Sequence, residues 1–366
     1  MKIATVTPFL VGPRPSLDGW SMGQIMIFVK LETDSGLVGW GEAYALGHRQ
    51  RATREIILAL GEALKQMAEV SPRAFLHRIA KPMESKHPGI DYASAVSAIE
   101  IALWDLLGKA TGLPVHALLG GAIIDRVPVY ANAWDSPLQT PQAIADRCAM
   151  MHRQGYRAVK IYPLRQSSLA EAEACVRLTR EAVGWDVDIM LDFAIQKEPR
   201  QVLAAARLFE PYRPYWIEEP LAGDDPDALA EFRAATMTRV TTGERQAGTR
   251  HFRHLLDRRA ADVLNPDIAG VGGILTMLEI GAMADAHSVM ISPHSWNSTT
   301  VAFLAMLHTC AVMPNAIYAE LYYDYLELGA QFADCDYVIE DGVASLPRKP
   351  GLGVTMNEDV LRSLAP

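Results

Sequence analysis

Seven short apolar segments between residues 158 and 320 each end close to an ionisable side chain that could take part in acid–base or metal chemistry. In chain order these side chains are Lys160 with Tyr162, Asp192, Glu218, Glu244, Asp267, His294 and Glu320. The last six are separated by 26, 26, 23, 27 and 26 residues. Placing charge beside buried apolar chain costs free energy. Its regular repetition therefore indicates a ring of functional residues.

The carboxylates of Asp192, Glu218 and Glu244 end three consecutive segments and are expected to converge. Three converging carboxylates in a low-dielectric site repel one another and could not all stay ionised without a cation. A ligand set of oxygen atoms alone favours Mg²⁺, with Mn²⁺ as the second choice. We therefore predict one Mg²⁺ per chain; separate ion pairs with neighbouring arginines are the alternative.

The other ionisable residues suggest proton transfer beside that metal. Asp267 would fix the tautomer of His294 and raise its basicity, which makes the histidine a general base. Lys160 and Tyr162 are two residues apart on one strand and so share a face. Glu320 could accept a hydrogen bond from a substrate oxygen or donate a proton to it. A metal flanked by a base is suited to removing the proton next to a carboxylate.

The spacing also predicts the elements that carry these residues. A strand of about five residues, a helix of about twelve and two short loops match the interval, which is the βαβ unit of a parallel barrel. Adding 127–132 as a first strand gives eight strands, the number that closes a barrel. Helices are expected at 141–154, 168–183, 198–209, 225–235, 248–257, 273–286 and 298–312. Residues at the carboxyl ends of barrel strands share one mouth, where active sites lie.

Residues 1–125 do not follow this rhythm and predict an α+β domain. Strands are expected at 1–10 and 26–33, and a hairpin turn at 34–36 leads into a third short strand within 34–43. Helices are expected at 51–70 and 91–110. The expected fold class is thus α/β, a TIM-type (β/α) barrel with an α+β N-terminal domain. The expected domains are 1–125, a barrel at 126–322, and a tail at 323–366 that returns to the first domain.

Composition excludes several other classes of protein. The chain has 366 residues and a formal net charge of −9, with no basic cluster, which argues against binding to nucleic acid. No apolar stretch is long enough for a membrane span, and the first residues do not resemble a signal peptide. Four cysteines without metal-ligand spacing are expected to be free thiols, so we predict a cytoplasmic protein.

Five motifs carry a resemblance to a known family. They are GYRAVKI at 155–161, WIEEPL at 216–221, TGE at 242–244, NPDIAGVGGI at 265–274 and SPHS at 292–295. With them the chain resembles the mandelate racemase and muconate lactonizing branch of the enolase superfamily. The resemblance implies a modified, enolase-like barrel, a capping domain formed by the N-terminal domain and the tail, and a homo-oligomer.

The same resemblance implies roles for individual residues. Asp192, Glu218 and Glu244 correspond to the Mg²⁺ ligands, His294 with Asp267 to the base, and Glu320 to the electrophilic or acid partner. Capping loops near 14–23 and 44–50 would choose a small-molecule carboxylate substrate. Within these loops we predict that Arg14, Trp20 and His48 contact the substrate.

Two positions depart from the family pattern. Lys160 matches the first lysine of a K-x-K motif, but Tyr162 stands where the second lysine would act as a base. A tyrosine with a pKa near 10 is a poor base at neutral pH unless Lys160 lowers that pKa. Ala194 stands where the pattern D-x-N would place an asparagine. Both departures weaken the case for a simple racemase.

With one competent base, the expected reaction is dehydration of an acid sugar to a 2-keto-3-deoxy acid, with the leaving hydroxyl protonated by His294 or Tyr162. A racemase, epimerase or cycloisomerase that uses Tyr162 and Lys160 as a second acid or base is the alternative. A non-catalytic metal-binding descendant is a third possibility. A two-metal hydrolase is disfavoured, because the first strand does not end in an H-x-H pair.

Overall fold

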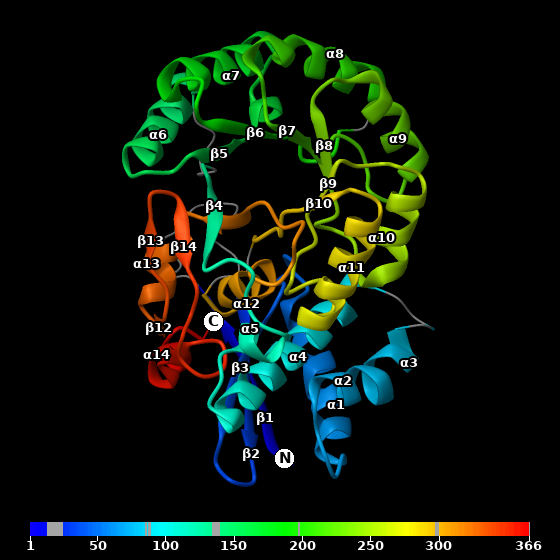
Figure 1. Ribbon diagram of the computed structural model, residues 1–366, viewed down its shortest axis with the longest axis vertical. Helices are drawn as coiled ribbons and strands as arrows, with labels where there is room; N and C mark the ends of the chain where they lie inside the picture. The colour runs from blue at the N-terminus through cyan, green and yellow to red at the C-terminus, as the bar shows by residue number, and fades with distance from the viewer. Residues whose placement is uncertain are drawn as a thin grey trace.

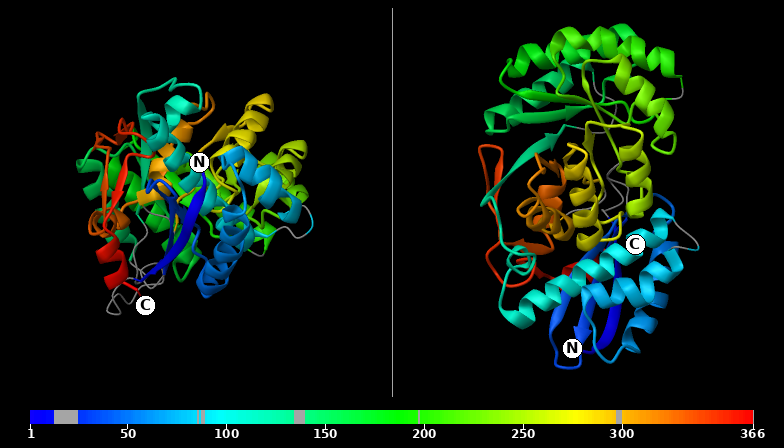
Figure 2. Two further views of the ribbon diagram at one scale, coloured as in Figure 1. Left: turned by 90° about the horizontal axis from the view of Figure 1, so that it is seen from below. Right: turned by 45° about the vertical axis from the view of Figure 1, so that its right-hand side comes forward.

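The structure is a computed structural model that describes residues 1–12, 25–84, 86, 89–133, 140–196, 198–296 and 300–365. Two of the predicted substrate contacts, Arg14 and Trp20, lie outside the described residues. Figures 1 and 2 show a barrel of strands and helices above a smaller layer built from the N-terminal segment.

Eight parallel strands of the described chain form the barrel, in the order β10-β9-β8-β7-β6-β5-β4, with β11 on the other side of β4. A parallel bridge between Ile291 and Ala316, just before β11, closes the ring. The predicted barrel is therefore confirmed. The strands are β4 (Arg126–Asn132), β5 (Ala158–Ile161), β6 (Asp188–Asp192), β7 (Trp216–Glu218), β8 (Arg239–Thr242), β9 (Val263–Leu264), β10 (Met290–Ile291) and β11 (Ala319–Tyr322).

Helices cover the outside of the strands and lie within one or two residues of the predicted ranges (Figure 1). The sequence marks where several of them begin, because α6, α8 and α9 each start with a proline that follows a capping residue. At the start of α6, for example, the Thr140 hydroxyl accepts the Ala143 N–H. The helices are α6 (Pro141–Arg153), α7 (Leu169–Val183), α8 (Pro199–Phe209), α9 (Pro226–Ala235), α10 (Gly248–Asp257), α11 (Ile274–Ala286) and α12 (Thr300–Cys310), with short turns η2 (Pro163–Arg165) and η3 (Glu210–Tyr212).

An apolar layer fills the barrel below its mouth. Successive side chains of a strand alternate in direction, so a residue two positions before a mouth residue points into the same interior. Four buried residues occupy such positions, Tyr130, Ala158, Met190 and Trp216, and they form one cluster with the buried Val263 of β9. The rings of Tyr130 and Trp216 meet edge to face, with centroids 5.5 Å apart. This layer excludes water from beneath the ionisable ring.

The N-terminal layer is a three-stranded antiparallel sheet with helices on one side (Figure 2). Gly41 allows its close packing, since a Cβ there would lie 1.8 Å from the carbonyl oxygen of Ala98. The predicted helix at 51–70 ends earlier, at Lys65, and Ser71 starts a separate helix by accepting the Ala74 N–H. The elements are β1 (Ile3–Val11), β2 (Met26–Thr33), β3 (Val38–Ala43), α1 (Gln50–Lys65), α2 (Pro72–Phe75), η1 (Leu76–Ala80), α3 (Lys81–Glu84), α4 (Ile90–Thr111) and α5 (Val115–Leu118).

The chain after β11 contacts both layers. Within it, β14 pairs antiparallel with β4, and the Gly12 N–H donates to the Leu364 carbonyl oxygen at 2.9 Å. Lys30 and Glu358 form an ion pair at 2.8 Å. The domain boundaries at 125 and 322 stay predictions. The elements are α13 (Tyr325–Ala330), β12 (Ala333–Cys335), β13 (Ile339–Glu340), β14 (Val343–Ser345), β15 (Val354–Met356) and α14 (Glu358–Ser363).

No helix among the described residues is long and apolar enough to cross a membrane. The four cysteines are free thiols, as predicted.

Buried carboxylates tie the N-terminal layer to the barrel. Glu100, on α4, accepts the backbone N–H groups of Ile274 and Leu275 at the start of α11, together with the indole N–H of Trp104. Burial raises the pKa of Glu100 to about 7, although these three N–H groups oppose the rise. Glu42, on β3, likewise accepts the N–H of Ala302 in α12. The two layers therefore meet through the N-termini of barrel helices.

We predict that Glu100→Leu lowers the free energy of unfolding by about 3 kcal/mol, because three buried N–H groups lose their acceptor. Urea unfolding followed by tryptophan fluorescence measures this. The exposed Glu279, which pairs with Lys81 at the surface, provides the control: Glu279→Leu should change the value by less than about 1 kcal/mol. Equal effects of the two substitutions would contradict this account of the junction.

Candidate active site

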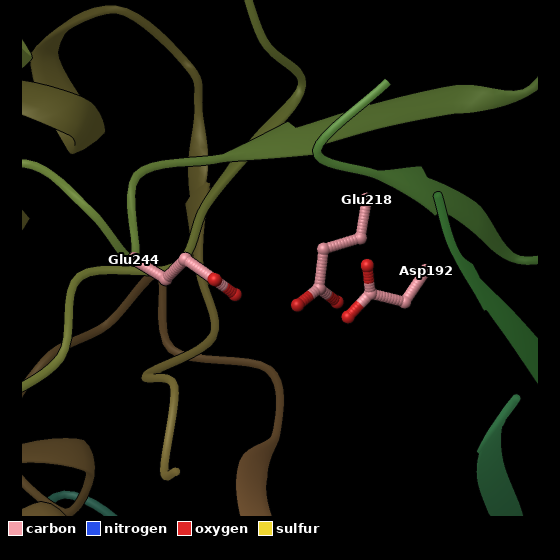
Figure 3. Close-up of side chains that lie close together, drawn as sticks. All are labelled: Asp192, Glu218 and Glu244. Atoms are coloured by element: carbon pink, nitrogen blue, oxygen red, sulfur yellow. The ribbon is translucent and has the colours of Figure 1, made fainter. Parts of the chain in front are cut away.

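The structure brings three of the predicted side chains together at the carboxyl ends of adjacent strands. Asp192 ends β6, Glu218 ends β7, and Glu244 follows β8. One carboxylate oxygen from each lies within 4.8 Å of the others, and all three residues are buried. Figure 3 shows the carboxylates of Asp192 and Glu218 side by side, with that of Glu244 directed toward them.

This acidic cluster fits a hard divalent cation. Burial raises the pKa of Asp192 to about 6, with Lys160 opposing the rise and Glu244 adding to it. Burial also raises the pKa of Glu218 well above its ordinary value, again against Lys160. Carboxylates that resist ionisation when close together are stabilised by positive charge. Since the cluster offers only oxygen atoms, its chemistry suits Mg²⁺ better than a softer metal.

Two basic side chains of the described chain lie against the cluster: Arg245, whose Nε is 3.3 Å from Glu244 Oε1, and Lys160. Lys160 is fully buried at the end of β5, and its Nζ lies 2.7 Å from Glu218 Oε1 and 2.8 Å from Glu320 Oε1. Asp192 Oδ2 is more distant, at 3.7 Å. Burial would lower the pKa of Lys160, but these carboxylates outweigh it and raise the pKa well above the ordinary value. Lys160 is therefore a fixed positive charge in this arrangement.

His294 lies between two carboxylates on the other side of the cluster. Its Nδ1 donates to Asp267 Oδ2 at 2.9 Å, and its Nε2 lies 3.2 Å from Glu244 Oε2. Burial lowers the pKa of His294, but Glu244, Glu320 and Asp267 outweigh it and raise the pKa to about 10. Because Asp267 occupies Nδ1, Nε2 faces the carboxylate cluster. The ring keeps its proton there while the charges of Glu244 and Glu320 are uncompensated, and a cation bound by the cluster would offset those charges and lower this pKa toward the range in which His294 can act as a base.

Glu320 accepts hydrogen bonds on both of its oxygens. Oε1 receives the amide of Asn132 and the ammonium of Lys160, each at 2.8 Å, and Oε2 receives the backbone N–H of Ser295 at 3.0 Å. Burial would raise the pKa of Glu320, but Lys160 and His294 outweigh it and hold the pKa below its ordinary value. Glu320 is thus an ionised acceptor here, and its expected role toward the substrate stays a prediction.

Asn132 is a member of this ring that the sequence reasoning missed. It ends β4, pairs with Lys160 across the parallel strands, and donates its amide to Glu320 and to the Tyr162 hydroxyl. The signal was present, since Asn132 ends the first predicted strand as the ionisable residues end the others. An amide has no charge, so a pattern defined by ionisable strand ends does not include Asn132.

Tyr162 lies beside Lys160 but is not activated by it. The Lys160 Nζ is 5.9 Å from the centre of the Tyr162 ring, and the Tyr162 hydroxyl accepts the Asn132 amide at 2.9 Å. Burial raises the pKa of Tyr162 well above its ordinary value, and the opposing effect of Lys160 is smaller. The hydroxyl therefore stays protonated, which suits a proton donor and not a base.

The backbone around the cluster contains strained residues. Ala194, Ile195 and Glu219 have positive φ angles of 51°, 59° and 45°. The Ile195 N–H donates to the Glu219 carbonyl oxygen at 2.9 Å, and the Ala194 N–H donates to Asp192 Oδ1 at 2.7 Å. Left-handed conformations of non-glycine residues cost free energy and occur preferentially at functional sites. The strained turns direct Asp192 and Glu218 toward Glu244.

One of the predicted substrate contacts can be placed. His48 is exposed in the turn that precedes α1, with a φ of 65°. Tyr44, four residues earlier in the same segment, is buried and packs on the ring of His294, which the sequence reasoning did not anticipate. Contact of His48 with a substrate stays a prediction.

Comparison with known families covers nearly the whole chain. Residues 143–360 match the family described as enolase C-terminal domain-like. Residues 18–120 match the N-terminal domain of mandelate racemase and muconate lactonizing enzyme.

Individual relatives agree with these matches. A D-gluconate dehydratase from Thermoproteus tenax is 33% identical over 378 residues, covering 98% of this chain and 73% of the relative. A D-galactonate dehydratase from Ralstonia nicotianae is 31% identical over 380 residues, covering 98% and 93%. The crystal structure of an enolase from environmental sequencing of the Sargasso Sea has a TM-score of 0.95 and 35% identity, covering 100% of this chain and 97% of the other.

We predict that Asp192→Asn stabilises the protein without Mg²⁺ and makes it less stable than the wild type when Mg²⁺ is present. The pKa of Asp192 is about 4 in the unfolded chain and is raised to about 6 in the folded protein. Ionising this carboxylate therefore costs more in the folded state, so the wild type loses stability as the pH rises through this range. A variant without the carboxylate does not. In EDTA at pH 8 the variant should therefore melt at a higher temperature than the wild type. In saturating Mg²⁺ the wild type should gain stability through binding and become the more stable protein.

Calorimetric titration with Mg²⁺ should give a dissociation constant about a hundredfold weaker for Asp192→Asn, on the scale of removing a ligand or its support. The surface variant Glu279→Gln should bind Mg²⁺ as the wild type does. Equal Mg²⁺ affinity of wild type and Asp192→Asn would rule out a cation held by the acidic cluster.

Proposed function

The chain belongs to the mandelate racemase and muconate lactonizing branch of the enolase superfamily, and from this membership and the geometry of the ring we propose that it is an acid-sugar dehydratase. Members of this class are lyases or isomerases, and the named relatives are dehydratases of D-gluconate and D-galactonate. The proposed reaction removes water from a sugar acid and leaves a 2-keto-3-deoxy acid. D-gluconate and D-galactonate are the first candidate substrates.

The observation that carries the proposal is the contrast between His294 and the pair Lys160 and Tyr162. His294 has one ring nitrogen bound to Asp267 and the other directed at the acidic cluster. Lys160 is held between Glu218 and Glu320, and the Tyr162 hydroxyl accepts a hydrogen bond while retaining its own proton. A racemase or epimerase needs a base on each face of the substrate. The ring supports a base on one side only, which favours elimination.

The proposed mechanism assigns one proton transfer to each side. His294 Nε2 takes the proton from the carbon next to the carboxylate, and the electron pair of that C–H bond moves toward the carboxylate. As the electrons return, the C–O bond to the β-hydroxyl breaks, and the Tyr162 hydroxyl gives the proton that lets it leave as water. The remaining enol rearranges to the 2-keto acid. Asp267 holds His294 in the required tautomer throughout.

The residues around the acidic cluster would stabilise the negative charge that develops on the substrate during the reaction. A divalent cation held by Asp192, Glu218 and Glu244 supplies positive charge where negative charge develops on the substrate carboxylate. Lys160 adds a second positive charge beside Glu218 and Glu320. The layer of Tyr130, Trp216 and their neighbours keeps water from below, which strengthens these interactions. Assembly into a homo-oligomer stays a prediction.

We predict that His294→Asn lowers kcat for dehydration by at least about a thousandfold, because the proton next to the carboxylate loses its base. The wild type and the variant are incubated with Mg²⁺ and either D-gluconate or D-galactonate in deuterated water. A keto-acid assay follows water loss, and proton NMR follows exchange. Asparagine is close to histidine in size and retains a polar group toward Asp267, so folding can be checked by melting.

Other outcomes would identify other members of the superfamily. Deuterium exchange or inversion by the wild type without keto acid would move the protein to the epimerases and racemases, with Tyr162 as a second working residue. Tight Mg²⁺ binding without exchange or elimination for any sugar acid would favour a non-catalytic descendant.

We predict that Tyr162→Phe separates the two steps of the reaction. Loss of the proposed acid should lower the rate of water loss by about ten- to a hundredfold. Exchange of the α-proton with deuterated water should continue near the wild-type rate, because His294 and Asp267 are unchanged. Elimination at the wild-type rate in this variant would instead mean that His294 returns its proton to the leaving hydroxyl.

A further inference from the structure

Asn132 lies between the two elements that position Tyr162 and Glu320. It ends β4, which pairs on one side with β5, just before Tyr162, and on the other side with β11, which carries Glu320. The side chain is only 1% exposed. The next residue, Ala133, donates its N–H to the Lys160 carbonyl oxygen at 2.9 Å, which fixes the backbone here. Asn132 can therefore reach both neighbouring strands from one fixed position.

A single nitrogen atom of Asn132 makes both contacts. Its Nδ2 donates to Glu320 Oε1 at 2.8 Å and to the Tyr162 hydroxyl oxygen at 2.9 Å. An amide nitrogen carries two protons, so each contact uses one of them. The amide thus joins the proposed acid of the reaction to the carboxylate of Glu320.

Glu320 determines which way the Asn132 amide is turned. Both of its oxygens face other donors, since Oε1 receives the Lys160 ammonium at 2.8 Å and Oε2 receives the Ser295 N–H at 3.0 Å. A carboxylate held in this way is an acceptor only, so an amide oxygen turned toward it would set two acceptors against each other. The nitrogen must therefore face Glu320, and its second proton then points to Tyr162.

The same amide determines the direction of the Tyr162 hydroxyl. A phenol hydroxyl has one proton, which rotates about the C–O bond to suit its surroundings. Because the hydroxyl oxygen accepts a proton from Asn132, its own proton must point away from Asn132. An apolar side chain at position 132 would remove this restraint and leave the orientation of the hydroxyl proton to its other surroundings.

We propose that Asn132 is a positioning residue for the second proton transfer: it holds the Tyr162 hydroxyl as an acceptor, so that the hydroxyl proton is presented to the leaving group of the substrate. This inference rests on the proposed function, because it takes Tyr162 as the acid. Asn132 acts through Tyr162 and needs no contact with the substrate. Loss of the amide should therefore slow the departure of water and spare removal of the α-proton, which is assigned to His294.

Asn132→Leu removes both donated protons with little change in side-chain size. With Mg²⁺ and D-gluconate or D-galactonate, we expect water loss to slow about tenfold, which corresponds to about one hydrogen bond. Exchange of the α-proton with deuterated water should stay within about threefold of the wild type. Glu320 should keep its place in this variant, because Lys160 and the Ser295 N–H still hold it.

A second variant replaces the donor by an acceptor of the same size. In Asn132→Asp the Tyr162 hydroxyl would turn its proton toward the new carboxylate, so water loss should fall at least as far as in Tyr162→Phe. This variant carries the test if Asn132→Leu does not fold. Water loss at the wild-type rate in either folded variant would overturn the proposal.

Asn315→Leu is the matched control. Asn315 is also buried and its Nδ2 also donates twice, to the carbonyl oxygens of Gly281 at 3.1 Å and Val289 at 3.0 Å. Val289 precedes β10, so this amide lies at the opposite end of the strands from the ring. The control should lower the melting temperature, while water loss and exchange stay within about twofold of the wild type.

A double-mutant cycle tests whether Asn132 acts through Tyr162. In the Tyr162→Phe background, Asn132→Leu should slow water loss by less than about threefold more, because the proton that the amide directs is already absent. The same tenfold factor in both backgrounds would show that Asn132 acts independently of Tyr162. An equal fall of water loss and exchange in Asn132→Leu would show a general loss of structure. Either result would overturn the proposal.

Melting temperatures separate this inference from the proposed reaction. Asn132→Leu should lower the melting temperature more in the wild type than in Tyr162→Phe, because only the wild type has the amide–hydroxyl bond to lose. Additive shifts would overturn the positioning of Tyr162 by Asn132, whether or not the protein is active. If the wild type dehydrates neither aldonate but the shifts are not additive, Tyr162 fails as the acid together with the reaction, while its hydrogen bond to Asn132 is supported.

Discussion

The structure depends on holding several carboxylates together in a place that water hardly reaches. Asp192, Glu218, Glu244, Asp267 and Glu320 are all buried at the mouth of one barrel. Lys160, His294 and Arg245 are set directly against them, with Arg245 Nε 3.3 Å from Glu244 Oε1. Because like charges at low dielectric repel strongly, such a group persists only if the surrounding fold prevents it from separating.

The rest of the fold provides this restraint. The barrel fixes the strand ends relative to one another, and the apolar layer of Tyr130, Met190 and Trp216 fills the space beneath them. From the other side, Glu42 and Glu100 bind the first turns of α12 and α11, so the N-terminal layer is attached to the helices that flank the site. The turns at Ala194 and Glu219, where the φ angles are positive, are joined by the hydrogen bond from the Ile195 N–H to the Glu219 carbonyl oxygen. Favourable packing and hydrogen bonding in the rest of the fold thus offset the repulsion between the buried carboxylates of the site.

Residues of the same type have different proposed roles in the ring because their hydrogen-bond partners and neighbouring charges differ. Lys160 and His294 are both buried beside carboxylates, yet Lys160 is held on two sides by Glu218 and Glu320, whereas His294 has one nitrogen directed into the site. Tyr162 and Tyr44 are both buried phenols whose pKa values are raised. The hydroxyl of Tyr162 accepts the Asn132 amide, and the ring of Tyr44 packs edge to face against His294. The same residue types therefore serve different purposes.

The sequence alone determined the barrel and most of its ring. Alternating apolar strands and capped helices at a regular interval are local signals, and the closure of eight such units brings their carboxyl ends together by geometry. Residues at or just beyond strand ends, such as Asp192, Glu218 and His294, could therefore be identified without coordinates. The extra pairing of β14 with β4, the attachment through Glu100 and the place of Tyr44 beside His294 were decided only in three dimensions. They join segments far apart in the chain, and no local pattern in the sequence records which distant atoms will meet.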